Sequence, residues 1–154
     1  MRLQATWDAT PDDAWGLLQL SSSGARSIEQ GVRSRWREIE VHFLDLDLLY
    51  SSADWPEEFV DEFLPRTLEG MAARAKDALP ATSWSLRDEI TGASWVVDGT
   101  GTQPTPDAAS HHVVGPGHAL LAWIWGRSFS SALRVEKSPN EALALLLPRY
   151  LPPM

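Results

Sequence analysis

The clearest hydrophobic pattern lies between residues 28 and 46. Apolar side chains recur there at steps of three and four residues, the spacing of one face of an α-helix. Ser27 precedes the run and Gln30 stands three residues later, which predicts a capping box at the helix start. We therefore expect one helix from about Ile28 to Leu46, with an apolar stripe made of Ile28, Val32, Trp36, Ile39, Phe43 and Leu46.

A polar row follows one edge of this stripe and consists of Glu38, His42 and Asp45. Glu38 and His42 are four residues apart, so a helix places them one above the other on the same face. A carboxylate and an imidazole stacked in this way can share one divalent metal ion. The row is therefore either the lining of a site in a helix bundle or a solvated flank carrying an intrahelical Glu–His pair.

The pattern on either side of this helix predicts further elements. Residues 1–27 look irregular, with one short helix that begins at Thr10 and Pro11. A second long helix is expected from a cap at Asp54 to about residue 78. Pro65 lies inside it and predicts a kink or a break.

The remainder of the chain changes to short alternating runs bounded by Gly, Pro and Ser, which are typical of strands. Strands followed by flanking helices favour an antiparallel sheet in an α+β domain. The expected strands are 83–88, 93–98, 109–114 and 133–136, and the expected helices are 118–125 and one from about 141 to 147.

Length and charge narrow the class of protein. The 154 residues fit one ordinary domain, or a small domain with an attached element. A net charge of -8 argues against a nucleic-acid or anionic-membrane partner, because phosphate binding needs a basic surface. No apolar run reaches membrane-spanning length, and residues 1–7 lack the apolar core of a secretion signal. We expect a cytoplasmic protein with no membrane partner.

The chain has no cysteine and four histidines. Without cysteine, thiol chemistry would need a thiol supplied by a cofactor, and a zinc site would need histidine, carboxylate or water ligands. His111 and His112 alternate on a predicted strand, so they should point to opposite faces, and we expect ordinary strand-surface positions for them. His118 stands at a predicted helix start.

Several motifs, in order, resemble those of the mycothiol-dependent maleylpyruvate isomerase family. The resemblance covers about residues 5–154, and the order and spacing of the motifs carry it. The matching motifs are Arg37-Glu38-x-x-x-His42-x-x-Asp45-Leu46, Trp84-x-Leu86, Trp95-Val96-Val97, and the stretch from Val114-Gly115-Pro116 to Gly126-Arg127.

The resemblance implies a DinB-like helical bundle followed by a small antiparallel sheet domain with flanking helices, similar to sterol-carrier proteins. Residues 1–50 would form a partial bundle that contains the metal-motif helix 28–46, and residues 51–154 would form the C-terminal α+β domain. The family's early helices, with a further histidine ligand, would precede Met1. An apolar stripe without those helices invites a homodimer.

The resemblance also implies a site. Glu38 and His42 match two ligands of a divalent metal, most often zinc, and Asp45 matches an acidic position that would hydrogen-bond the metal-bound histidine. Arg127 falls where the family has an arginine that would hold a small-molecule carboxylate substrate. Its other interpretation is a cation that neutralises a helix C-terminus.

Two functions follow from these residues. The first is a metal- and mycothiol-dependent isomerase or thiol transferase, in which a thiol adduct allows cis–trans isomerisation of a carboxylate substrate. The second is a non-catalytic small-ligand-binding or dimeric assembly module derived from that family. A third metal ligand near Glu38 and His42 is the feature that discriminates between them.

Overall fold

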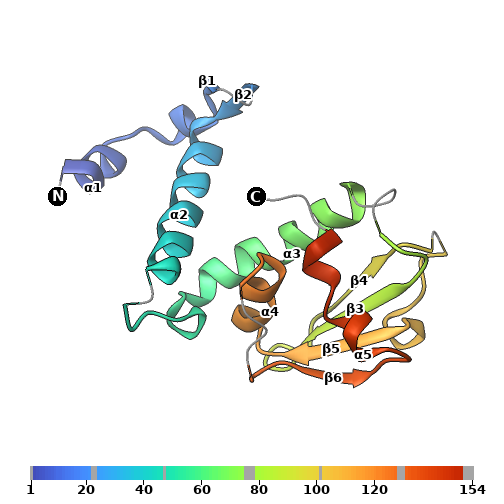
Figure 1. Ribbon diagram of the computed structural model, residues 1–154. Helices are drawn as coiled ribbons and strands as arrows, with labels where there is room; N and C mark the ends of the chain where they lie inside the picture. The colour runs from blue at the N-terminus through green and yellow to red at the C-terminus, as the bar shows by residue number, and fades with distance from the viewer. Residues whose placement is uncertain are drawn as a thin grey trace. The chain divides into compact units, whose positions relative to one another are not determined.

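The computed structural model describes residues 2–21, 24–46, 48–74, 79–100, 102–127 and 131–150. The chain divides into two compact units, Met1–Tyr50 and Ser51–Met154. Helices and strands occur in both units, and the sheet of the second unit is flanked by helices, which confirms the α+β class (Figure 1).

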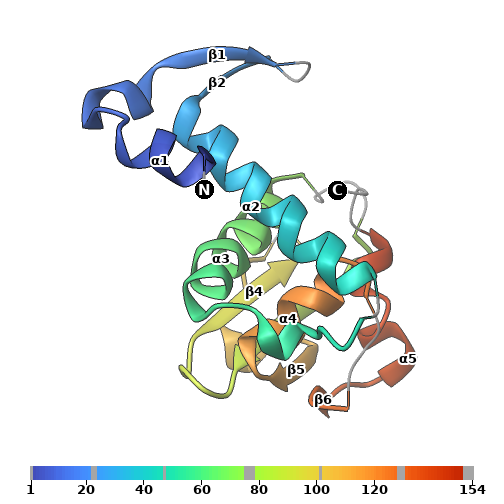
Figure 2. The same cartoon turned by 90° about the vertical axis from the view of Figure 1, so that its left-hand side faces the viewer.

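The first unit has several short elements before its long helix. The pattern predicted one short helix near Thr10, and the structure has a 3-10 helix there together with a helix and a hairpin that were not expected. The two strands pair antiparallel and lead directly into the long helix (Figure 2). These elements are α1 (Arg2–Asp8), η1 (Asp12–Gly16), β1 (Leu18–Ser21) and β2 (Gly24–Ser27).

The long helix of this unit, α2 (Ile28–Asp45), follows the prediction closely. The hydroxyl of Ser27 accepts a hydrogen bond from the Gln30 backbone at 3.1 Å. The Gln30 side chain accepts one from the Ser27 backbone at 3.0 Å. This reciprocal pair is the predicted capping box, and it satisfies two of the amide groups that a helix start leaves open.

The second unit is built on a four-stranded sheet in the order β4-β3-β5-β6. The outer pairs are antiparallel as predicted, whereas the central pair of β3 and β5 is parallel. A short turn joins β3 to β4, but a longer connection returns the chain to the other side of β3, which permits the parallel pairing. The strands are β3 (Ser83–Asp88), β4 (Ser94–Asp98), β5 (His111–Gly115) and β6 (Arg134–Lys137).

The long helix and the helix near residue 118 start close to their predicted positions. Asp54 does not cap the long helix; its carboxylate accepts hydrogen bonds from the backbone and hydroxyl of Ser51, both at 2.8 Å. The long helix continues through Pro65 without a break, and its predicted end near 78 lies outside the described residues. The helices are η2 (Ser52–Asp54), α3 (Glu57–Arg74), η3 (Pro106–Ala108), α4 (Gly117–Ile124), α5 (Glu141–Ala144) and η4 (Leu147–Tyr150). The last helix was predicted to run through residue 147, but α5 ends at Ala144 and is followed by η4, and η2 and η3 were not predicted.

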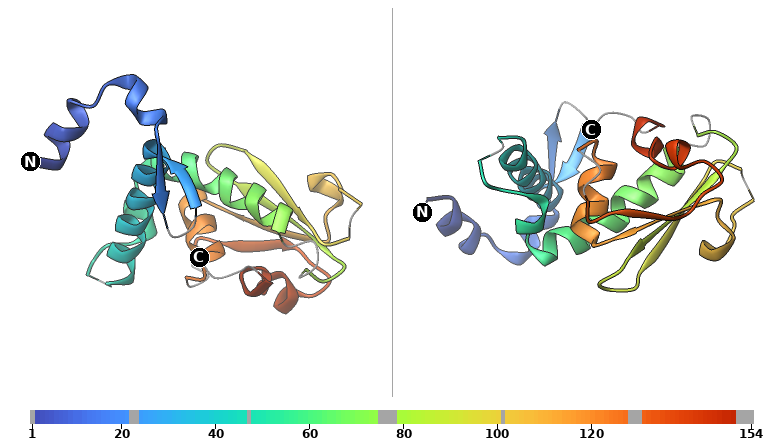
Figure 3. Two further views of the ribbon diagram at one scale, coloured as in Figure 1. Left: turned by 90° about the horizontal axis from the view of Figure 1, so that it is seen from above. Right: turned by 60° about the horizontal axis from the view of Figure 1, so that its bottom comes forward.

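The core of the second unit lies between the sheet and its helices, with α3 running across the strands (Figure 3). Trp84 and Leu86 point to this side and are fully buried. The indole of Trp84 donates to the carbonyl of Ala144 at 3.1 Å, which fixes α5 on the same face. Seven of the eight residues of α4 are buried, as expected for a helix that is apolar all round.

His111 corrects one expectation. It was expected on the strand surface, but its side chain is completely buried. Its ring lies on Trp84 with centroids 5.3 Å apart, and its Nδ1 lies 2.7 Å from the Ser138 hydroxyl. Strand alternation places it on the helix-covered face beside Trp84, a choice of face that the sequence alone left open.

In the described part of the chain, no helix is long and apolar enough to cross a membrane.

Candidate functional site

The polar row on α2 forms as its spacing predicts. His42 Nε2 lies 3.4 Å from a carboxylate oxygen of Glu38, and His42 Nδ1 lies 3.8 Å from a carboxylate oxygen of Asp45. The second oxygen of Glu38 accepts a hydrogen bond from Arg37 at 3.1 Å. One helix therefore places a carboxylate on each side of the same imidazole.

This geometry fits two ligands of one zinc ion. Zinc binds imidazole nitrogen and carboxylate oxygen at about 2.1 Å, and two such ligands at the tetrahedral angle lie roughly 3.4 Å apart. The distance between His42 Nε2 and Glu38 Oε2 is 3.4 Å. Asp45 lies near the other ring nitrogen, and its role in orienting a metal-bound histidine stays a prediction.

The ligand set that the described residues offer is incomplete. A zinc site has at least three protein ligands, and Glu38 and His42 supply two. Across the described ranges, no group of three or more His, Cys, Asp or Glu side chains could hold a metal ion. The feature that would discriminate between the two functional interpretations is therefore not found in the part of the chain that the structure describes.

An exposed apolar surface lies beside the polar row. Ile39, Phe43 and Leu46 are 47%, 56% and 58% exposed. In a soluble protein, large apolar side chains gathered on one face mark an interaction surface. The predicted stripe therefore ends in a surface that stays open to solvent along the same stretch of helix as Glu38 and His42.

Arg127 lies in the second unit, directly after α4 and Gly126. Gly126 has φ +82°, the left-handed conformation that ends many helices. The guanidinium of Arg127 donates to the carbonyl of Trp125 at 2.6 Å, and the Arg127 backbone donates to the carbonyl of Ala122 at 3.0 Å. These contacts agree with the helix-terminus role, and the substrate role stays a prediction.

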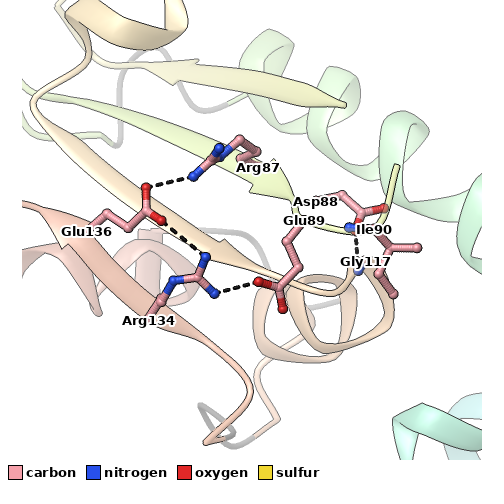
Figure 4. A network of polar contacts seen from close by, with 7 residues as sticks. All are labelled: Arg87, Asp88, Glu89, Ile90, Gly117, Arg134 and Glu136. Atoms are coloured by element: carbon pink, nitrogen blue, oxygen red, sulfur yellow. Dashed lines mark hydrogen bonds and ion pairs between the residues drawn. The ribbon is translucent and has the colours of Figure 1, made fainter. Parts of the chain in front are cut away.

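The second unit contains a polar junction that the sequence analysis missed. Asp88, at the end of β3, is buried and accepts hydrogen bonds from the backbone amides of Ile90 and Gly117 (Figure 4). It also accepts one from the hydroxyl of Thr91. A side chain on Gly117 would meet Asp88 Oδ2 at 3.1 Å and Val60 Cγ1 at 3.0 Å. Because Gly117 has no side chain, the start of α4 can approach both residues. In the sequence, Asp88 followed by Thr91 and Gly92 was the pattern that could have indicated this junction.

A pocket of about 270 Å³ opens beside this junction. His118 lines it, and its Nδ1 lies 3.3 Å from the hydroxyl of Ser52. Burial lowers the pKa of His118, and the nearby Asp88 carboxylate opposes that shift. Apolar side chains make up much of the remaining wall, including Trp55, Val60 and Ile90.

The other two histidines, His111 and His112, lie on β5 in the second unit. Burial, and after it the neighbouring His112, lower the pKa of His111, which favours its neutral form. His112 has its Nε2 3.1 Å from the carbonyl of Ala109.

The described elements define an α+β protein with a helical first unit and a helix-covered sheet. A solved mycothiol-dependent maleylpyruvate isomerase shares this fold, with a TM-score of 0.60 and 21% sequence identity. A histidine-to-alanine mutant of such an isomerase matches with the same values. The alignment covers 88% of this chain but 52% of the isomerase, so the chain spans about half of its length.

No protein-family model matches the sequence, and no curated protein is significantly similar to it. At 21% identity the structural likeness shows the fold alone. It agrees with the family resemblance of the sequence motifs at the level of architecture.

Proposed function

We propose that this chain contributes half of the metal site of a mycothiol-dependent isomerase or thiol transferase of the maleylpyruvate isomerase type. The observation that carries the proposal is the 3.4 Å separation of His42 Nε2 and Glu38 Oε2, which suits two ligands of one tetrahedral zinc ion. The class of chemistry proposed is that of the solved mycothiol-dependent maleylpyruvate isomerase with which the chain shares its fold.

A second copy of the chain would complete this site. The pair supplies two ligands, so two copies together would offer two carboxylates and two imidazoles, enough for a four-coordinate zinc ion. Ile39, Phe43 and Leu46 lie exposed on the same helix and give a second copy an apolar surface to bury. In an antiparallel pair of helices centred on residue 40, Glu38 of one chain would stand opposite His42 of the other.

The residues of this chain would have distinct roles in such a site. Asp45 would orient the His42 ring. Arg37 would hold Glu38 through Oε1, the carboxylate oxygen that faces away from His42 Nε2. Arg127 would bind a carboxylate of the substrate, because a guanidinium pairs with carboxylate in a bidentate manner. A bound metal ion would supply the positive charge that lowers the pKa of a thiol such as that of mycothiol.

Metal analysis of the purified protein tests this proposal. We expect one zinc ion for every two chains in the wild type and none in His42→Ala. His112→Ala is the matched control, since it removes a histidine from the second unit and should leave the metal content unchanged. An absence of metal from the wild type after zinc is supplied, or full retention in His42→Ala, would contradict the proposal.

One observation favours the binding-module alternative. The pocket of about 270 Å³ beside His118 has the mixed apolar and polar wall of a small-ligand site. A non-catalytic module would bind a small, partly apolar molecule there without needing Glu38 or His42. Ligand-induced protection of the Val60 and Ile90 amides from hydrogen exchange, unchanged in His42→Ala, would favour this alternative.

A further inference from the structure

The sheet of the second unit has a polar outer face. Strand alternation turns Trp84 and Leu86 toward the helices and leaves Ser85 and Arg87 on the opposite side. The 3-10 helix η3 contacts β3 and β4. Together with residues on this outer face of the sheet, η3 lines a pocket of about 220 Å³. The pocket is lined by Ser85, Arg87, Ser94, Pro106, Asp107, His112, Val114 and Glu136.

Ser85 is the unusual residue of this pocket. It is only 5% exposed, and it lies between Val96 on β4 and His112 on β5. Its hydroxyl lines the pocket. A bound ligand can therefore reach this hydroxyl and form a hydrogen bond with it.

A chain of ion pairs fixes the charged wall of the pocket (Figure 4). Arg87 donates to Glu136 at 2.7 Å, Arg134 donates to the other oxygen of Glu136 at 3.1 Å, and Arg134 also pairs with Glu89. The positive charge of Arg87 is therefore already balanced. Asp107 adds a carboxylate to the lining. Among the described residues of this lining, Arg87 is the one arginine or lysine, and it is already paired with Glu136, so the pocket disfavours an anion.

The remaining groups alternate between donors and acceptors. When its ring is neutral, His112 donates through Nε2 to the carbonyl of Ala109, which leaves Nδ1 as an acceptor. Ser94 adds a second hydroxyl, and Val114 and Pro106 add a small apolar surface. Interleaved donors and acceptors over a small apolar patch match a molecule that carries several neutral hydroxyl groups.

We propose that this pocket binds an uncharged polyhydroxylated molecule of the size of a monosaccharide, with the Ser85 hydroxyl as its buried hydrogen-bonding anchor. The pocket lies wholly in the second unit and uses none of Glu38, His42, Asp45 or Arg127. The proposal therefore stands independently of the metal site.

Nuclear magnetic resonance titration of the full chain tests this proposal, with glucose and mannitol as probes and sodium acetate as the anionic comparison. We expect saturable shifts of the Ser85, Ser94 and His112 amides with a sugar or polyol, and none with acetate. Loss of one neutral hydrogen bond in Ser85→Ala should weaken binding about fivefold.

Ser52→Ala is the matched control, because it removes a hydroxyl on a different element outside this pocket and should leave the affinity unchanged. The proposal is overturned if neither polyol gives saturable shifts. It is also overturned if acetate alone binds, or if Ser85→Ala binds the polyol as tightly as the wild type.

Discussion

The two units of this protein differ in the solvent exposure of their large apolar side chains. In the second unit, Trp84, Leu86 and Leu120 are completely buried between sheet and helices. In the first unit, Phe43 and Leu46 of α2 are each more than half exposed. The second unit thus closes its own core, whereas the first has exposed apolar side chains on the same helix as Glu38 and His42. The proposed dimer would cover those side chains and complete the proposed metal site.

The largest effect that separates the two units should come from removing a core tryptophan. Trp84→Ala deletes a fully buried ring and its hydrogen bond to Ala144, and should lower the free energy of unfolding by about 3–5 kcal/mol. Phe43→Ala, at an exposed position, should cost less than about 1 kcal/mol in dilute protein. Urea unfolding of both variants measures this, and equal losses would contradict the comparison.

A smaller loss is expected at the polar junction of the second unit. Asp88→Ala leaves the buried amide of Gly117 without its acceptor and should cost about 2–3 kcal/mol. Asp88→Asn keeps one carbonyl acceptor and should cost less than half as much. Thermal unfolding of the pair measures this, and the account of the junction fails if the alanine variant is as stable as the asparagine variant.

The pH dependence of stability should also reflect the second unit. Burial lowers the pKa of His111, whose Nε2 is buried without a partner among the described residues. Below the unfolded-state pKa of about 6.5 the unfolded chain binds more protons than the native protein, so stability falls as pH decreases. His111→Phe should reduce the slope of unfolding free energy against pH between about 5 and 6.5. A slope equal to that of the wild type would contradict this reasoning.

The smallest expected effect on unfolding comes from charging the exposed stripe. Phe43→Glu should change the unfolding free energy of the second unit by less than about 0.5 kcal/mol, because Phe43 belongs to the first unit and is exposed there. It should nevertheless separate the proposed dimer, as measured by sedimentation velocity. Leu20→Glu is the control, since Leu20 is exposed on the β1–β2 hairpin and lies outside the stripe. If both variants dissociate the dimer, or if neither does, the apolar stripe of α2 is not the dimer interface.

The local features of the fold followed from the sequence because they depend on near neighbours. The Ser27–Gln30 capping box, the extent of α2 and the alignment of Glu38, His42 and Asp45 rest on helical spacing alone. The strands of the second unit were likewise visible as alternating runs.

The features that the sequence did not reveal depend on contacts between distant segments. The parallel pairing of β3 with β5 and the burial of His111 against Trp84 follow from the path of the intervening chain. The β1–β2 hairpin was missed because its strands are short and Leu18 and Leu20 are exposed, so no buried face gave a signal. Arg127 shows a helix-terminus contact that spacing could not distinguish from a substrate role.

The most direct test of the central claim is the molar mass of the wild-type protein by light scattering, measured with zinc content in the same fractions. We expect a species of twice the 17.1 kDa chain mass that carries one zinc ion for every two chains. We also expect His42→Ala to lose the metal. A single-chain mass with no bound zinc, in the presence of added zinc, would contradict the proposal that two copies build one site.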